Sequence, residues 1–227
     1  MLHAYFQYFL FISPALLLAA WAQMRIRSTY AAAQRMPAPL SGAAAARHVL
    51  DSAGLSGIEI EQVPGHLSDH YDPRHKVLRL SSEVFGSRSL AAVGIAAHEA
   101  GHAIQDAKHY MPLVVRNAAV PAAGFGSNAS IIMLIAGAIF RFPPLIWVGI
   151  GLFACVVFFQ VVNLPVEFNA SARAKAQLVS LGIVDQEGMV YVNRVLNAAA
   201  MTYVAATLQA ILTLLYYVMR YAGGSSD

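Results

Sequence analysis

The sequence His98-Glu99-Ala100-Gly101-His102 lies inside an apolar run, LAAVGIAAHEAGHAIQ at residues 90–105, and the rest of the chain is interpreted outward from it. Small and apolar residues surround the two histidines and the glutamate, and we predict a helix over 90–108. In an α-helix, residues four apart differ by about 40° around the axis. His98 and His102 would then project from one face, one turn apart. Two imidazole nitrogens so placed can bind one Zn²⁺ at about 2.0–2.1 Å.

Glu99 directly follows the first histidine, so its carboxylate can lie beside a metal ion without binding it. From there it could act as general base and then general acid, using a zinc-activated water. The spacing is the HExxH pattern of zinc metalloproteases. Three ionisable groups in an apolar run would cost several kcal/mol on burial if they were left unpaired. The pattern therefore predicts a catalytic metal centre rather than a chance match.

The composition predicts a membrane protein. Of the 227 residues, 58% are hydrophobic and 12% are charged, whereas a soluble domain has about 25% charged residues. Arg25 and Arg27 follow the first apolar run, which favours a retained membrane helix over a cleaved signal peptide. A bilayer is crossed by about 20 apolar residues, and the runs long enough to do so are 2–24, 114–140, 143–162 and 198–221.

The remaining residues predict one small catalytic lobe made of two pieces, 25–113 and 163–197. A membrane hairpin over 114–162 separates the pieces, and residues 222–227 form a tail. Residues 58–61 and 76–80 alternate with period two, which predicts two strands and a short β-hairpin. The polar segment 67–74 between them is predicted to be a turn. Ser41 and Ser89 are candidate N-caps for the helices 43–51 and 90–108.

The charge pattern also limits the partners. The formal net charge is only +3, and scattered basic residues make nucleic acid an unexpected partner. The expected surroundings are a lipid bilayer. The second apolar run is rich in glycine and alanine, which would allow a homo-oligomer or contact with another membrane protein.

A catalytic zinc site needs a third protein ligand, and Glu167 is the best candidate. The HExxHxxGxxH extension is absent, because Gln105 and Lys108 occupy those positions. Glu167 follows the third apolar run, and two crossings return it to the side of the histidines. Its alternative interpretation is a membrane-edge glutamate in the first turn of a helix. The other acids after Glu99 are less suitable: Asp106 lies too far along the same helix, Asp185 and Glu187 lie in a solvated turn, and Asp227 lies across the membrane.

Several linked motifs resemble the YugP-type membrane zinc metallopeptidases, and the resemblance covers nearly the whole chain. It implies one zinc ion per chain on His98, His102 and Glu167, with Glu99 catalytic, in a lobe similar to that of the gluzincins. The motifs, in chain order, are Asp69-His70-Tyr71-Asp72-Pro73-Arg74, Leu78-Arg79-Leu80-Ser81, the run from His98 to Gln105, and Pro165-Val166-Glu167-Phe168-Asn169-Ala170-Ser171.

The residues after Glu167 are also similar to those of the HtpX/Ste24 membrane proteases, with Ala170 and Ala174 at matching places. Those proteases usually carry an aspartate four places after the glutamate, where it orients a histidine ligand. Ser171 stands there in this chain. Asn169 and Asp106 are candidates to take over that part.

An oxyanion partner is still needed for catalysis. His70, Tyr71 and Arg173 can each supply a donor, although His70 and Tyr71 also suit a structural turn and Arg173 suits a membrane-edge charge. The strand at 76–80 precedes the metal helix. We expect it to bind an extended substrate by strand addition.

The sequence therefore predicts a mainly α-helical membrane protein that acts as a zinc metalloendopeptidase on membrane-near or unfolded segments. The alternative is a catalytically inactive scaffold that binds metal or recruits partners. Hydrolysis of a bond other than a peptide bond is also left open. Basic residues are more numerous on the lobe side than beside Arg141 and Arg220, which predicts a cytoplasmic lobe with both termini outside, in a bacterial inner or plasma membrane.

Overall fold

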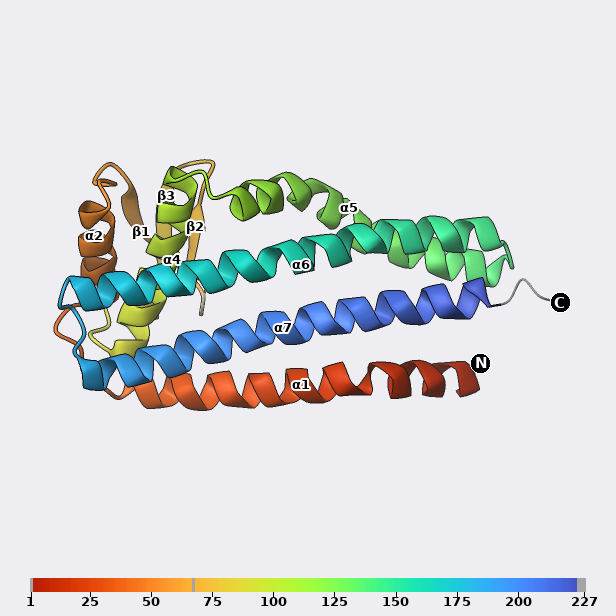
Figure 1. Cartoon of the computed structure of the whole chain (residues 1–227), viewed down its shortest axis with the longest axis horizontal. Coiled ribbons are helices and arrows are strands. Elements are labelled where there is room, and N and C mark those ends of the chain that lie inside the picture. The colour runs from red at the N-terminus through yellow and green to blue at the C-terminus, as the bar shows by residue number, and fades with distance from the viewer. Residues whose placement is uncertain (1, 67, 224–227) are drawn as a thin grey trace. The chain divides into compact units, whose positions relative to one another are not determined.

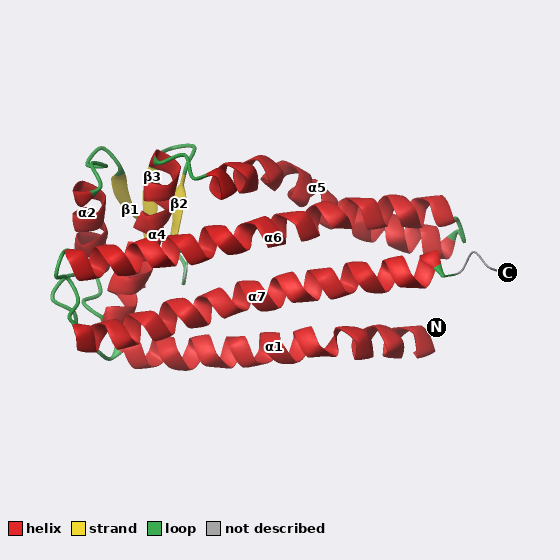
Figure 2. Cartoon of the chain, viewed as in Figure 1, coloured by secondary structure: helices red, strands yellow, loops and turns green. Residues whose placement is uncertain are grey.

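The structure, a computed structural model, describes residues 2–66 and 68–223 (Figure 1). Most of the predicted tail, 224–227, lies outside the described residues. The described strands are confined to one short stretch of a largely helical chain (Figure 2). The elements are α1 (Leu2–Gln34), α2 (Gly42–Ser52), β1 (Glu59–Val63), β2 (His70–Asp72), β3 (Val77–Ser81), α3 (Ser82–Phe85), α4 (Leu90–Ala107), α5 (Met111–Ile139), α6 (Pro143–Ser180) and α7 (Gln186–Ala222).

Helices α1, α5, α6 and α7 are long and apolar enough to cross a membrane. Many large apolar side chains on them are exposed, as in Leu17, Ile132 and Trp147. Exposed apolar surface of this extent is expected where lipid replaces water. The predicted fold class, a mainly helical membrane protein with a small α+β lobe, is therefore confirmed.

The chain divides into two compact units. The first, called the membrane unit, comprises residues 1–21, 114–164 and 202–227, and the second, called the lobe, comprises 22–113 and 165–201. Helices α1, α5, α6 and α7 each have residues in both units. Helix α1 continues beyond the predicted apolar run 2–24 as far as Gln34, because Ala31, Ala32 and Ala33 are strong helix formers.

The lobe contains a three-stranded sheet in the order β1-β3-β2. The two predicted strands are present, but they pair in parallel, with Ile60 opposite Leu78. The antiparallel hairpin is formed by β2 and β3, with Tyr71 opposite Leu78. Segment β2 was predicted to be a turn, and the turn lies just after it, where Asp72 Oδ1 accepts the main-chain N–H groups of Arg74 and His75.

The position of β3 corrects one prediction. Because β3 is the central strand, β1 and β2 already occupy both of its edges. Substrate addition to the strand at 76–80 is therefore wrong. The edges of the sheet that remain are those of β1 and β2.

The lobe core lies between the sheet and helices α2, α4 and α7, and Leu50, Leu78, Val93 and Val192 are fully buried in it. Two serines begin the helices that pack there, as predicted. Ser41 Oγ accepts the N–H of Ala44 at 3.3 Å, and Ser89 Oγ accepts the N–H of Ala92 at 3.2 Å. Each such cap contributes about 1 kcal/mol to helix stability.

Close contact between α4 and α6 depends on small residues. A methyl group placed on Gly101 would lie only 2.6 Å from the carbonyl oxygen of Ala170. Ala100, Ala103 and Ala174 are fully buried beside this contact. The glycine inside the HExxH motif therefore lets the backbone of α6 approach the face that carries the histidines.

Candidate metal centre

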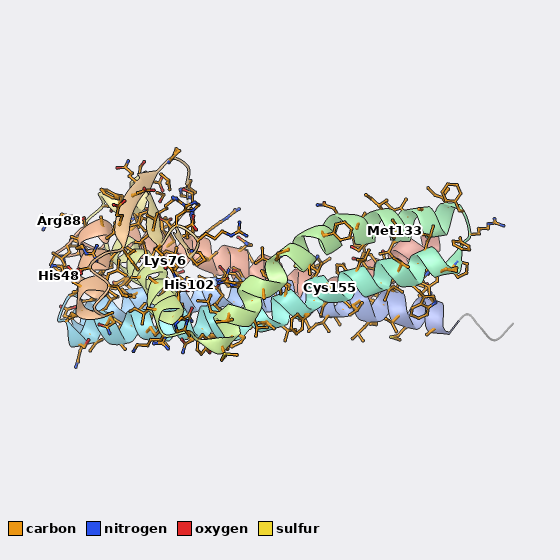
Figure 3. The ribbon with its side chains drawn as sticks, turned by 90° about the horizontal axis from the view of Figure 1, so that it is seen from above. His48, Lys76, Arg88, His102, Met133 and Cys155 are labelled. Carbon is orange, nitrogen blue, oxygen red and sulfur yellow. The ribbon has the colours of Figure 1, made fainter. Side chains whose placement is uncertain are left out.

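One residue from α6 and two from α4 form a compact cluster in the lobe. His98 Nε2 lies 3.3 Å from Glu167 Oε2, and His102 Nε2 lies 3.7 Å from the same oxygen. His102, labelled in Figure 3, and Glu167 are buried, and His98 is only slightly exposed. One ligand atom from each residue lies within 4.8 Å of the other two. The three residues could thus hold one metal ion.

The cluster has the chemistry that a zinc ion requires. Glu167 Oε2 is buried and has no hydrogen-bond partner among the described residues, which is costly for a carboxylate unless something else binds it. Two imidazole nitrogens and one carboxylate oxygen are a known ligand set of catalytic zinc. Ligands about 2.0 Å from a tetrahedral ion lie about 3.3 Å apart, close to the separations in the cluster. The residues present fit the ion.

Each imidazole is held through its other nitrogen. His98 Nδ1 lies 3.0 Å from Ser171 Oγ, and His102 Nδ1 lies 3.0 Å from Gln105 Oε1. Ser171 itself, rather than Asn169 or Asp106, therefore contacts His98. A metal-binding histidine usually bonds its second nitrogen in this way, which fixes the ring orientation.

Gln105 is the residue of the cluster that the sequence interpretation missed. Its side chain is fully buried, yet in the sequence it was noted only as a departure from an extended motif and as the last residue of a family motif. A signal was present, because an amide in an otherwise apolar helix must find partners when it is buried. The partner helix could not be read from the sequence.

Glu99 projects from α4 toward the edge of the sheet. Its Oε2 accepts the main-chain N–H of Tyr71, at 3.2 Å. Burial raises the pKa of the Glu99 carboxyl, and the neighbouring His98 and His102 oppose this rise. A raised pKa brings a carboxylate closer to the range in which it accepts a proton effectively near neutral pH.

The three predicted oxyanion donors have other partners. His70 is exposed, and its Nδ1 lies 2.8 Å from the carbonyl oxygen of Ser68. The Tyr71 hydroxyl donates to Asp106 Oδ2 at 2.8 Å, and burial together with this acceptor raises the pKa of Tyr71.

Arg173 lies on α6, beyond the cluster. Its Nε donates to Asn169 Oδ1 at 2.7 Å, and its guanidinium carbon lies 5.9 Å from the centre of the Tyr110 ring. The structure thus brings His98, His102 and Glu167 together, with Glu99 beside them. Within the described part of the chain, the side chains of His70, Tyr71 and Arg173 make no hydrogen bond to these residues, and Tyr71 reaches Glu99 only through its main-chain N–H.

A helical membrane protein with such a cluster on an HExxH helix has the features of a membrane metallopeptidase. Residues 8–222 match the family described as "Putative neutral zinc metallopeptidase". The match covers most of the chain, and the chain belongs to this family. The predicted resemblance is confirmed, and the protein is a zinc metallopeptidase.

One relative extends this result over almost the full length. The chain is 41% identical over 222 residues to the "Putative membrane protease YugP" of Bacillus subtilis (strain 168), which covers 96% of this chain and 99% of that protein. No solved structure matches the chain. The family of the chain is therefore shown by sequence similarity, and the geometry described above offers a candidate metal site.

Proposed function

We propose that the protein is a membrane-embedded zinc endopeptidase in which His98, His102 and Glu167 hold one zinc ion per chain. The observation that carries the proposal is the buried Oε2 of Glu167, which lacks a hydrogen-bond partner in the described chain and faces two imidazole nitrogens. When bound, zinc polarises a carbonyl oxygen and lowers the pKa of a water molecule. The remaining chemistry belongs to residues of this chain.

Glu99 is proposed as the general base and then the general acid. The main-chain N–H of Tyr71 holds one of its oxygens, so the carboxylate has a defined orientation beside the two histidines. Glu99 takes a proton from the attacking water and delivers it to the leaving amine of the peptide bond.

His70, Tyr71 and Arg173 are the proposed candidates for stabilising the oxyanion. Loss of one such donor typically lowers kcat by about 100- to 1000-fold. Replacement of each residue in turn, by His70→Ala, Tyr71→Phe and Arg173→Gln, would identify the donor by that magnitude. Replacement of a residue that only supports the fold would lower activity and stability together.

Membrane-near or unfolded polypeptide segments are the proposed substrates. The third apolar run predicted from the sequence ends at residue 162, and Glu167 follows it by five residues on the same helix. At about 1.5 Å per residue, this is about 7.5 Å along the helix. A catalytic residue so close to a membrane-spanning segment favours substrates that lie near the bilayer.

The lobe is proposed to face the cytoplasm of a bacterium. The excess of basic residues on the lobe side over Arg141 and Arg220 supports this orientation. Single cysteines at Arg74 and Arg141, in a Cys155→Ala background, would test it. With a membrane-impermeant maleimide on intact cells, we expect labelling of R141C only, and labelling of R74C alone would reverse the orientation.

Glu99→Gln is the decisive test of the activity. The substitution keeps the shape of the side chain but removes the base, so cleavage of casein should fall by at least about 100-fold, while zinc stays near one ion per chain. Glu187→Gln, at an exposed position, is the matched control and should cleave normally. Full activity of the Glu99 variant would refute its role. Zinc-loaded wild type that cleaves no peptide would favour the scaffold, or a hydrolase of lipids or esters if such substrates are cleaved.

A further inference from the structure

Gln105 uses both ends of its amide inside the lobe. Its Oε1 lies 3.0 Å from His102 Nδ1, and its Nε2 lies 2.8 Å from the carbonyl oxygen of Val166 and 3.0 Å from Asn169 Oδ1. The side chain is fully buried, so water does not compete for these contacts. All three partners of one amide are therefore protein groups.

The donors and acceptors permit only one arrangement. The Val166 carbonyl can only accept a hydrogen bond, so the NH₂ group of Gln105 must face it. Arg173 Nε, which can only donate, points at Asn169 Oδ1 at 2.7 Å, so the oxygen of Asn169 is fixed and also accepts from Gln105. Gln105 Oε1 is then left to face His102. His102 must donate from Nδ1, and in its neutral form this leaves the lone pair of Nε2 directed at the cluster.

The same amide reaches the third ligand through the backbone. Val166 immediately precedes Glu167 on α6. A hydrogen bond to the Val166 carbonyl therefore ties the turn that carries Glu167 to the turn of α4 that carries His102. One side chain thus contacts His102 on α4 and the turn of α6 that carries Glu167.

The support of His98 is different in kind. Ser171 Oγ lies 3.0 Å from His98 Nδ1, but a hydroxyl group can either donate or accept. Ser171 is compatible with both neutral tautomers of His98 and selects neither. Gln105 admits only one tautomer of His102.

We propose that Gln105 is a positioning residue that sets the tautomer of His102 and holds the α6 turn carrying Glu167. This inference rests on the proposed function, because it takes these residues to be zinc ligands. Gln105 has no contact with the reacting atoms. Its effect is exerted on metal affinity and on the geometry of the ligands.

The test compares Gln105→Leu, Gln105→Glu and Ser171→Ala in the full-length protein, purified in detergent. Zinc affinity is measured by competition with a chelator, and ligand geometry by the visible absorption of the protein loaded with Co²⁺. Loss of a group that supports a metal ligand typically weakens metal binding by about 10- to 100-fold. We expect that loss in Q105L, with an altered cobalt spectrum, and a loss below about fivefold in S171A.

Gln105→Glu separates the contact of Gln105 with His102 from its contacts with α6. It keeps an acceptor for His102 but removes the donors to Val166 and Asn169, so its zinc affinity should fall between those of wild type and Q105L. A zinc affinity equal to that of the wild type would limit the role of Gln105 to orienting His102. It would overturn the proposal that Gln105 holds the α6 turn. This variant also keeps the test decisive if Q105L fails to fold.

The outcomes distinguish this inference from the proposed function. If the wild type binds no zinc, the proposed site fails, and the inference fails with it. If the wild type binds zinc, and Q105L binds it within about twofold with an unchanged cobalt spectrum, only the positioning role is overturned.

Discussion

The α4–α6 helix pair and the β2–β3 hairpin both carry residues of the candidate site, but different forces hold them. The helix pair is joined by buried small residues and neutral hydrogen bonds, and the backbone of Ala170 lies close against Gly101. The hairpin is fixed by ion pairs near the surface, among them Arg79 with Asp72, at 2.6 Å, and Lys76 with Asp106. Packed interiors resist any added atom, whereas ion pairs that water still reaches contribute little. Substitutions should therefore have larger effects on the helix pair.

Removal of the carboxylate on the helix pair should have the largest effect. Because Glu167 lies at the centre of the cluster, Glu167→Ala should weaken zinc binding by more than about 100-fold, beyond the loss expected from a supporting residue. Metal analysis of the purified protein beside a chelator titration would measure this. Glu187→Ala, which removes an exposed carboxylate, should bind zinc as wild type does. Undiminished binding by the Glu167 variant would remove α6 from the site.

The packing of the helix pair can be tested without touching a ligand. In Gly101→Ala, the new methyl group would meet the Ala170 carbonyl at 2.6 Å, and overpacking of this kind costs about 1–3 kcal/mol. That outweighs the helix propensity of about 1 kcal/mol gained by alanine over glycine. Thermal unfolding should show a net loss of stability, accompanied by weaker zinc binding.

Gly57→Ala is the control for this substitution, since Gly57 is exposed and has no atom near its missing side chain. It should leave both the unfolding temperature and the zinc affinity unchanged. A stable Gly101 variant with normal zinc binding would show that the two helices can separate slightly without losing the site.

The sequence was sufficient for residues whose placement depends on local helix geometry, or on whether the number of predicted membrane crossings is odd or even. A spacing of four places His98 and His102 on one face of any helix. If the hairpin 114–162 crosses the membrane twice, Glu167 returns to the side of the histidines whatever the helices do in between. The structure gathers these three residues into one cluster, as that reasoning predicted.

The sequence was insufficient where a role depends on a distant backbone. Gln105 has its function because the Val166 carbonyl, 61 residues away, lies beside it, and no periodicity in α4 indicates this. Segment β2 is only three residues long, too short to display alternation, and it is a strand because β3 pairs with it. The turn indicated by Asp72 and Pro73 was therefore predicted over too long a segment.

A smaller effect is expected where the hairpin meets α4. In Tyr71→Phe, the hydroxyl bond to Asp106 is lost, but the main-chain N–H that holds Glu99 is kept. A hydrogen bond to a charged group contributes about 1.5–3 kcal/mol to stability, but Asp106 retains Lys76 as a partner, so only part of this loss should reach Glu99. We expect kcat/KM for a peptide to fall by no more than about tenfold. A fall of about 100-fold or more would instead identify the hydroxyl as the oxyanion donor.

The smallest effect should come from the ion pairs of the hairpin, and it should depend on pH. Hydrogen bonds from His75 and Arg79 hold the pKa of Asp72 well below its usual range, which is near 3.9 in an unfolded chain. A lowered pKa stabilises the folded state above about pH 4, and this contribution is lost as the pH falls through the folded-state pKa. Asp72→Asn keeps the turn acceptor, so it should lower the unfolding temperature slightly at pH 7 and less at pH 3. Glu59→Gln, at an exposed position on β1, is the control. A deficit in D72N that grows on acidification would mean that the charge of Asp72 does not hold the hairpin.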